Sequence, residues 1–138
     1  MAVNTAFADE GDAVALFRDE DRVDRMFAAA SALFHEDFET VVRGWPEGER
    51  SYHGLLENQR FWEDWLAPWV EYRQEAWKAI DLGDSVLVLF HDYGRRQDST
   101  REVRGETAGI WTVRDGRVAR AEFFLSPEEA FRAAGLEQ

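Results

Sequence analysis

The feature that most constrains the fold is an Asp-Gly pair, Asp115 and Gly116, between two stretches of alternating apolar and polar residues. Such a dipeptide in this setting is the strongest short-range signal of a β-hairpin with a two-residue type I′ turn. The stretch WTVRDGRVARAEFF therefore predicts two antiparallel strands. It also raises a question of function, because the second strand carries two charged residues, Arg120 and Glu122.

A two-residue turn fixes which residues face one another across the hairpin. The expected pairs are Val113 with Val118, Trp111 with Arg120, Gly109 with Glu122, and Thr107 with Phe124. Because directly opposed residues share a face, Arg120 and Glu122 are expected beside Trp111, with a space over Gly109. One interpretation is a ligand pocket. The alternative is that Arg120 covers the Trp111 ring at the sheet surface with Glu122 as its ion-pair partner. One extra residue in the strand would reverse the assignment.

The opposite face of this hairpin is small and apolar, with few charges. Its members are Ala108, Ile110, Thr112, Ala119, Ala121, Phe123 and Leu125. A flat apolar surface of this kind suits contact with a second copy of the chain. The sequence therefore predicts a homodimer through this face.

The rest of the chain divides into a helical half and a stranded half. Helical spacing predicts a helix from Asp21 to about Phe34 and another from Gly54 to about Trp69, with a short strand FETVV and a turn RGWPEGER between them. Period-two alternation predicts strands at 70–80, 85–93, 102–113 and 117–125, and Ser126 and Pro127 begin a last helix. Helices followed by a strand meander indicate the α+β class, with helices over one face of a curved antiparallel sheet.

Composition limits the classes of function. The 138 residues suit a single domain, 1–138, of which residues 1–8 are expected to fray. A net charge of −12 disfavours binding to nucleic acid or to anionic lipid. No cysteine is present, so disulfides and thiolate chemistry are excluded. We expect a cytoplasmic protein, because no signal peptide is visible and no apolar run could span a membrane.

An ordered series of motifs resembles one known superfamily. The stretches HEDFE, YHGLLENQRFWEDW, AIDLGDSVLVLF, GIWTVRDGRVARAEFF and SPEEAFRAAGL follow one another over about residues 12–136. Together they resemble SnoaL-like members of the nuclear transport factor 2-like superfamily, which includes ketosteroid isomerases, polyketide cyclases and limonene epoxide hydrolases. The resemblance implies a cone-shaped, strongly curved sheet around a cavity that helices close. It also implies that homodimers form through the outer face of the sheet.

The resemblance carries over few catalytic residues. The isomerase's base falls near Val41 or Val42, its oxyanion-hole Asp on Gly109, and its oxyanion-hole Tyr near Arg18, so steroid isomerisation of that type is not expected. The epoxide hydrolases activate water with an Asp–Arg–Asp cluster. Here Glu122, Arg120 and Asp92 offer similar groups at other positions. The resemblance also places Val86, Val88, Phe90 and Asp92 on the cavity side with Trp111 and Phe124.

The three histidines are weaker candidates. His35 and Asp37 are expected at a helix end, as an acid/base pair or as groups that stabilise the helix terminus and turn. His53 is expected in a loop or a cap, and a role in the cavity is the alternative. His91 alternates with Asp92, so only one of them can face a cavity. No spacing typical of a metal site or a phosphate-binding loop is present, so we expect neither a metal nor a cofactor.

Three tryptophans, Trp62, Trp65 and Trp69, recur at helical spacing and form either an aromatic wall for a ligand or plain core. The leading hypothesis is a cofactor-independent isomerase, cyclase or hydrolase for a small hydrophobic or polyketide-like molecule. In it, Glu122 or Asp92 is the acid/base group and Arg120 stabilises negative charge. The predicted ligand wall comprises Trp62, Trp65, Trp69, Phe90, Trp111 and Phe124. Two alternatives stay open: a non-catalytic binding module, and a dimerisation domain with a filled interior.

Overall fold

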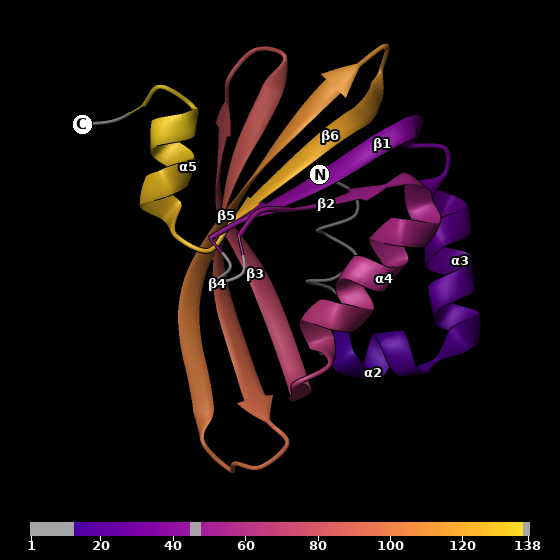
Figure 1. Cartoon of the computed structure of the whole chain (residues 1–138), viewed down its shortest axis with the longest axis vertical. Coiled ribbons are helices and arrows are strands. Elements are labelled where there is room, and N and C mark those ends of the chain that lie inside the picture. The colour runs from indigo at the N-terminus through magenta and orange to yellow at the C-terminus, as the bar shows by residue number, and fades with distance from the viewer. Residues whose placement is uncertain (1–12, 45–47, 137–138) are drawn as a thin grey trace.

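The computed structural model describes residues 13–44 and 48–136, and it shows helices packed on a six-stranded curved sheet (Figure 1). The helices are α2 (Ala13–Arg18), α3 (Glu20–Ala30), α4 (Gly54–Leu66) and α5 (Pro127–Ala133). The strands are β1 (Phe34–Arg43), β2 (Arg50–His53), β3 (Trp69–Asp81), β4 (Ser85–Arg96), β5 (Glu102–Arg114) and β6 (Arg117–Phe124), in the spatial order β2-β1-β6-β5-β4-β3. The predicted α+β class is confirmed.

Strands β3 to β6 form the predicted antiparallel meander, and its last turn is the predicted one. Asp115 and Gly116 both have positive φ, 55° and 77°, as a type I′ turn requires. The sheet as a whole is mixed, because β1 pairs with β6 in parallel and with β2 in antiparallel orientation. The residues predicted as the turn RGWPEGER lie partly outside the described ranges, and Arg50 at their end begins β2.

The helix predicted to run to Phe34 ends at Ala30, and Phe34 begins β1 instead. A spacing of four residues puts two side chains on one face of a helix and also on one face of a strand. Phe34 and Phe38 therefore fit both patterns, and they contact one another from β1 with ring centroids 4.5 Å apart. The start of α3, predicted at Asp21, is at Glu20 and is capped by Asp19, whose carboxylate accepts a hydrogen bond from the backbone N–H of Arg22 at 3.2 Å.

Helices cover the two faces of the sheet unequally. Figure 1 shows α2, α3 and α4 on one side and α5 on the other. We call the first side the inner face; it carries Val88, Phe90 and Trp111 together with Leu55 of α4. The buried side chains of Thr40 and Asn58 share a hydrogen bond that joins β1 to α4 on this face.

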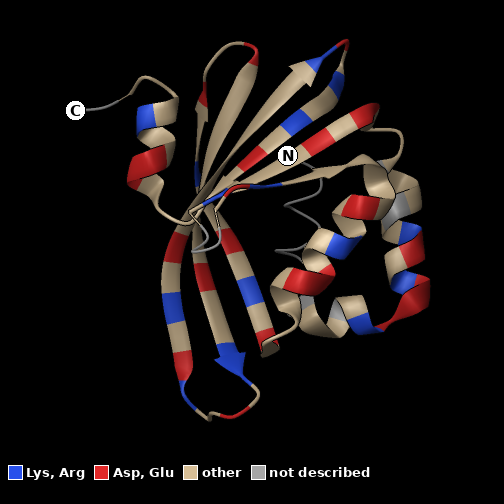
Figure 2. Ribbon diagram, viewed as in Figure 1, with Lys and Arg blue, Asp and Glu red and all other residues tan. Residues whose placement is uncertain are grey.

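The other side, the outer face, carries an apolar strip that α5 covers. The strip comprises Leu87, Leu89, Ala108, Ile110 and Phe124, and it packs against Ala130 and Phe131 of α5. Pro127 occupies the first turn of α5, as predicted, although the Ser126 side chain makes no capping hydrogen bond. Charges lie beyond the strip, and Figure 2 shows acidic and basic residues alternating along β3, β4 and β5 toward the β4–β5 hairpin.

The ladders shift register between Phe34 and Glu39 of β1, between Trp69 and Glu71 of β3, and at two further single-residue bulges. One falls at Trp77 in β3, between the pairs formed by Ala76 and Lys78. The other falls at Ala119 in β6, between the pairs Val113–Val118 and Thr112–Arg120. A bulge bends its strand and sends the following side chains to the opposite face. The second bulge decides where the predicted site lies.

Candidate active site

The predicted register of the β5–β6 hairpin holds for two pairs and is then wrong. Arg114 faces Arg117 and Val113 faces Val118, but beyond Ala119 every pair is shifted by one residue. Trp111 faces Ala121 instead of Arg120, and Glu122 faces Ile110 instead of Gly109. Because Trp111 belongs to the inner face and Ile110 to the outer face, Arg120 and Glu122 lie on the outer face.

The space predicted over Gly109 is also filled. A Cβ atom at Gly109 would lie 2.4 Å from the ring of Trp111, so the indole itself occupies that position. Gly109 serves the packing of Trp111 and leaves no gap for a ligand.

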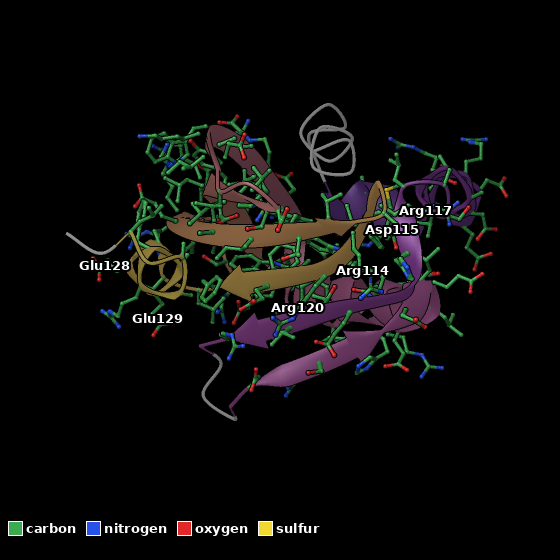
Figure 3. The ribbon with its side chains drawn as sticks, turned by 90° about the horizontal axis from the view of Figure 1, so that it is seen from above. Arg114, Asp115, Arg117, Arg120, Glu128 and Glu129 are labelled. Atoms are coloured by element: carbon green, nitrogen blue, oxygen red, sulfur yellow. The ribbon has the colours of Figure 1, made fainter. Side chains whose placement is uncertain are left out.

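On the outer face, Arg120 and Glu122 are members of an ion network that joins β2, β1 and β6. Arg120 donates to Glu122 at 2.8 Å and to Glu39 at 3.3 Å, and Arg43 donates to the second oxygen of Glu122 at 3.1 Å. His53 contacts Glu39 at 2.7 Å. Figure 3 labels Arg120 on β6, with Arg114, Asp115 and Arg117 at the hairpin end. Glu122 is thus held between two guanidinium groups, which is the arrangement of a structural partner.

The predicted dimer face does not exist as a single surface. Ala108 and Ile110 lie under α5 on the outer face, whereas Ala121 packs in the core of the inner face and Phe123 packs against it. The bulge at Ala119 separates these residues. Phe124, predicted on the cavity side, also lies on the outer face beneath α5, so that placement is wrong.

The inner face carries one buried carboxylate, Asp92 of β4, among the described residues. Its first oxygen, Oδ1, accepts hydrogen bonds from the Tyr72 hydroxyl and from Gln74 Nε2, both at 2.9 Å. Its second oxygen, Oδ2, accepts one from the Thr107 hydroxyl at 2.6 Å. We call Asp92, Tyr72, Gln74 and Thr107 the Asp92 cluster.

Strand register explains how the cluster forms. Gln74 of β3 is the direct partner of Asp92, and Thr107 of β5 is the direct partner of the neighbouring inner residue Phe90. These residues share one face, because inner positions recur at every second residue along each strand. The two strands that flank β4 therefore aim hydrogen-bond donors at one carboxylate.

Burial controls the protonation of this cluster. Loss of solvent raises the pKa of Asp92 above its ordinary value of 3.8, while the hydrogen bonds from Thr107, Tyr72 and Gln74 oppose the shift. Burial, followed by the nearby charge of Asp92, raises the pKa of the Tyr72 hydroxyl above its ordinary range. Tyr72 therefore remains a hydrogen-bond donor, and Asp92 is the member of the cluster whose proton can be exchanged.

Aromatic side chains lie against the cluster on the helical side. Trp69 and Trp65 contact Tyr72, with ring centroids 5.6 Å and 6.3 Å apart, and the Trp65 ring is nearly perpendicular to that of Tyr72. Trp62, which precedes Trp65 in α4, packs against Phe61 and Phe123. Phe90 and Trp111 pack edge to face on the inner face. Phe90, Trp111 and Asp92 thus lie on the inner face, and their roles in a ligand site stay predictions.

None of the described hydrogen bonds that hold Asp92 comes from a histidine. His35 is in β1 with its ring nitrogen 3.4 Å from Arg114, not at a helix end. His91 faces outward, where it stacks on Trp77 at 5.2 Å and lies 3.6 Å from Glu106. Within the ranges 13–44 and 48–136, no three histidine, aspartate or glutamate side chains gather so as to hold a metal ion. Over those same ranges, no helix is long and apolar enough to cross a membrane.

A groove of about 390 Å³ lies near the β4–β5 hairpin and shares Tyr72 with the Asp92 cluster. Its lining residues are Glu71, Tyr72, Arg73, Tyr93, Gly94, Arg95, Thr100 and Glu102. Several of them already bind one another: Arg95 contacts Glu71 at 3.1 Å, and the Arg73 guanidinium lies 4.4 Å above the Tyr93 ring. These contacts make the Asp92 cluster the better candidate for chemistry.

Of the predicted site residues, Asp92 alone brings an ionisable group to the inner face. The structure adds Tyr72, Gln74 and Thr107, which sequence reasoning missed. Their signal was present: Gln74 and Thr107 are uncharged polar residues at positions that alternate into an apolar face. These residues can be assigned to one cluster only when the register of β3, β4 and β5 is known.

Comparisons with known proteins agree with this fold. The SnoaL-like domain family matches residues 14–121. No curated protein sequence matches the chain. Among solved structures, TerC co-crystallised with polyporic acid is 22% identical, with 80% of this chain and 86% of that one covered at a TM-score of 0.62.

Two further structures cover similar shares. A protein named as a SnoaL-like polyketide cyclase from Jannaschia sp. CCS1 is 15% identical, with 83% and 81% covered and a TM-score of 0.62. An NTF2-like protein of unknown function from Burkholderia pseudomallei is 18% identical, with 96% and 97% covered and a TM-score of 0.62. At these identities the similarity to solved structures shows the fold alone. Because the family match spans most of the described residues, the chain belongs to the SnoaL-like domain family.

Proposed function

We propose that this chain is a cofactor-independent enzyme that uses Asp92 as its acid/base group on a small hydrophobic molecule. One observation carries the proposal: a buried carboxylate with a raised pKa lies on the inner face with only uncharged hydrogen-bond donors around it. A base of this kind takes a proton from a carbon or oxygen acid in its ionised form and returns it when protonated. The aromatic rings of Trp65 and Trp69 supply an apolar wall beside it.

The proton balance of such a step is simple. A C–H bond next to a carbonyl group breaks, the proton forms a bond with Asp92, and the electron pair remains in the enolate. Return of the proton to another carbon, or to the same one, completes an isomerisation or an exchange. Tyr72 and Gln74 hold Oδ1 throughout, so that the carboxylate does not rotate.

Hydrogen–deuterium exchange tests the proposal without knowledge of the natural substrate. The probe is 2-tetralone, a small hydrophobic ketone, in D₂O, with exchange at its α carbons followed by proton NMR. The unaltered protein should accelerate exchange, and Asp92→Asn should reduce the acceleration by about 100-fold or more while it still binds the ketone. Glu122→Gln, which changes a carboxylate on the outer face in the same way, is the matched control and should exchange at the unaltered rate.

The outcomes separate the alternatives. Equal acceleration by Asp92→Asn and the unaltered protein would show that Asp92 is not the base. Binding of the ketone with no acceleration by any variant would favour the non-catalytic binding module. Loss of exchange in Glu122→Gln alone would show that the catalytic carboxylate is Glu122, on the outer face.

The remaining partners are expectations of the same proposal. The net charge of −12 supports the absence of nucleic-acid binding, which a filter-binding assay with duplex DNA checks. A homodimer remains a prediction, although the residues predicted to form its interface do not share one surface. Sedimentation of the purified protein decides it, and a mass of one chain at all concentrations would contradict it.

A further inference from the structure

Three glycines on the inner face of β4 and β5 differ in what fills the position of their missing side chain. A Cβ atom at Gly94 would lie 2.6 Å from the Trp69 ring, and one at Gly109 would lie 2.4 Å from the Trp111 ring. Each of these glycines makes room for an indole. At Gly105 no described atom lies within 4 Å of the same position.

Gly105 has no other structural reason to be glycine. Its φ lies outside the left-handed region, so an L-residue would fit its backbone. Glycine in a strand also weakens the strand, because it loses more conformational freedom on folding and packs no side chain. The open space over Gly105 is therefore a feature that the fold does not require.

The space adjoins the acid. Gly105 is the direct β-ladder partner of Asp92, so the missing side chain would lie beside that of Asp92 on the inner face. Oδ1 is held by Tyr72 and Gln74 from β3, on the far side, whereas Oδ2 is held by Thr107 from β5, the strand of Gly105. The ladder between β5 and β6 ends at Ala108, so past this point β5 is paired with β4 alone.

We propose that Gly105 is the entry point of the acid site: the ligand reaches Oδ2 of Asp92 across Gly105, and it presents a proton-donating edge, such as an enol or phenol hydroxyl. This inference rests on the proposed function and adds the direction of approach and the class of ligand. Oδ1 already accepts two hydrogen bonds, whereas Oδ2 accepts one and has capacity for a second. While Asp92 is ionised, a group that fills this capacity must donate a hydrogen, as an enol or phenol does and an ether does not.

The first test needs no ligand. Gly105→Val places a β-branched side chain in the space; because no described atom lies within 4 Å of the added Cβ, the variant should fold with an undiminished melting temperature. The added apolar group removes water from Oδ2 and should raise the pKa of Asp92, measured by carbon-13 NMR of its carboxyl, by about 1. Arg104→Val adds the same side chain to the outer face of β5, away from the Glu106–His91 contact, and should leave that pKa unchanged.

The ionisable groups around Asp92 make a change in its pKa specific to the substitution at residue 105. The ionisable neighbours of Asp92 are Tyr72 on β3 and His91 on its own strand, and neither contacts residue 105 in the ladder. A pKa of Asp92 that is the same in Gly105→Val as in the unaltered protein would overturn the proposal. A variant that fails to fold would also overturn it, because the space would then not be free.

The second test compares two probes by calorimetry. 2-Naphthol, the aromatic counterpart of the tetralone enol, should bind at least about tenfold more tightly than its methyl ether, which cannot donate. Gly105→Val should weaken the binding of 2-naphthol by about tenfold or more, and Arg104→Val should not. Equal binding of the two probes would overturn the assignment of ligand class.

Failure of this inference is distinct from failure of the proposed function. If Gly105→Val retains naphthol binding and ketone exchange while Asp92→Asn loses exchange, Asp92 is still the acid/base group. In that case the ligand reaches it from another direction. If Asp92→Asn retains both, the acid itself is misassigned.

Discussion

Replacement of Asp92 by Asn should cost little stability at neutral pH, although Asp92 is buried and fully hydrogen-bonded. The amide oxygen can accept the bonds of Tyr72 and Gln74, and the amide nitrogen can donate to Thr107, whose hydroxyl reverses its role. Asp92→Ala instead leaves the donors of Tyr72 and Gln74 buried without their acceptor, which costs about 1 to 3 kcal/mol for each group. The two variants thus separate the charge of Asp92 from its hydrogen bonds.

The pH dependence gives the sharper result. Because burial raises the pKa of Asp92 above 3.8, the folded state holds this proton more tightly than the unfolded state. The resulting stabilisation is fully present below pH 3.8 and is lost as pH rises through the folded-state pKa. A tenfold difference in proton affinity between the two states corresponds to about 1.4 kcal/mol.

Urea unfolding at intervals from pH 4 to pH 8 measures this effect. The free energy of unfolding of the unaltered protein should fall with rising pH relative to that of Asp92→Asn. The difference between the two proteins cancels the other carboxylates, whose contributions are common to both. A difference that is constant with pH, or that grows in favour of the unaltered protein as pH rises, would refute the claim that burial dominates at Asp92.

Three further predictions concern other parts of the molecule. Gly109→Ala should lower the free energy of unfolding by about 2 kcal/mol, because its Cβ would collide with the Trp111 ring, and an unchanged urea midpoint would contradict this packing. Glu122→Gln should lower it by about 1 kcal/mol through loss of charge opposite Arg43 and Arg120, with the loss reduced at high salt. Elemental analysis of the purified protein should find no stoichiometric zinc or iron, and either metal in molar amount would contradict that expectation.

Local signals predicted the parts of the fold that depend on neighbouring residues. The Asp115–Gly116 turn, the meander and helix α4 each follow from a short stretch of chain. The bulge at Ala119 does not, because an alanine in an alternating strand carries no mark of an unpaired residue. This one inserted residue moves the side chains that follow it in β6 to the opposite face of the sheet. The predicted site and the predicted dimer surface are both wrong for that reason.

The same bulge explains why the chain keeps two very different carboxylates on one sheet. A proton placed on Glu122 would weaken ion pairs with both Arg43 and Arg120, so this carboxylate is committed to joining β1 and β6. A proton placed on Asp92 breaks no ion pair, because its hydrogen bonds come from uncharged groups, and the Thr107 hydroxyl can turn from donor to acceptor. Without the bulge, alternation would put Glu122 on the inner face together with Arg120, and Glu122 would lose its pairing with Arg43 of β1. The extra residue at Ala119 therefore keeps the ion-paired carboxylate outside and leaves the inner face to the acid that can gain and lose a proton.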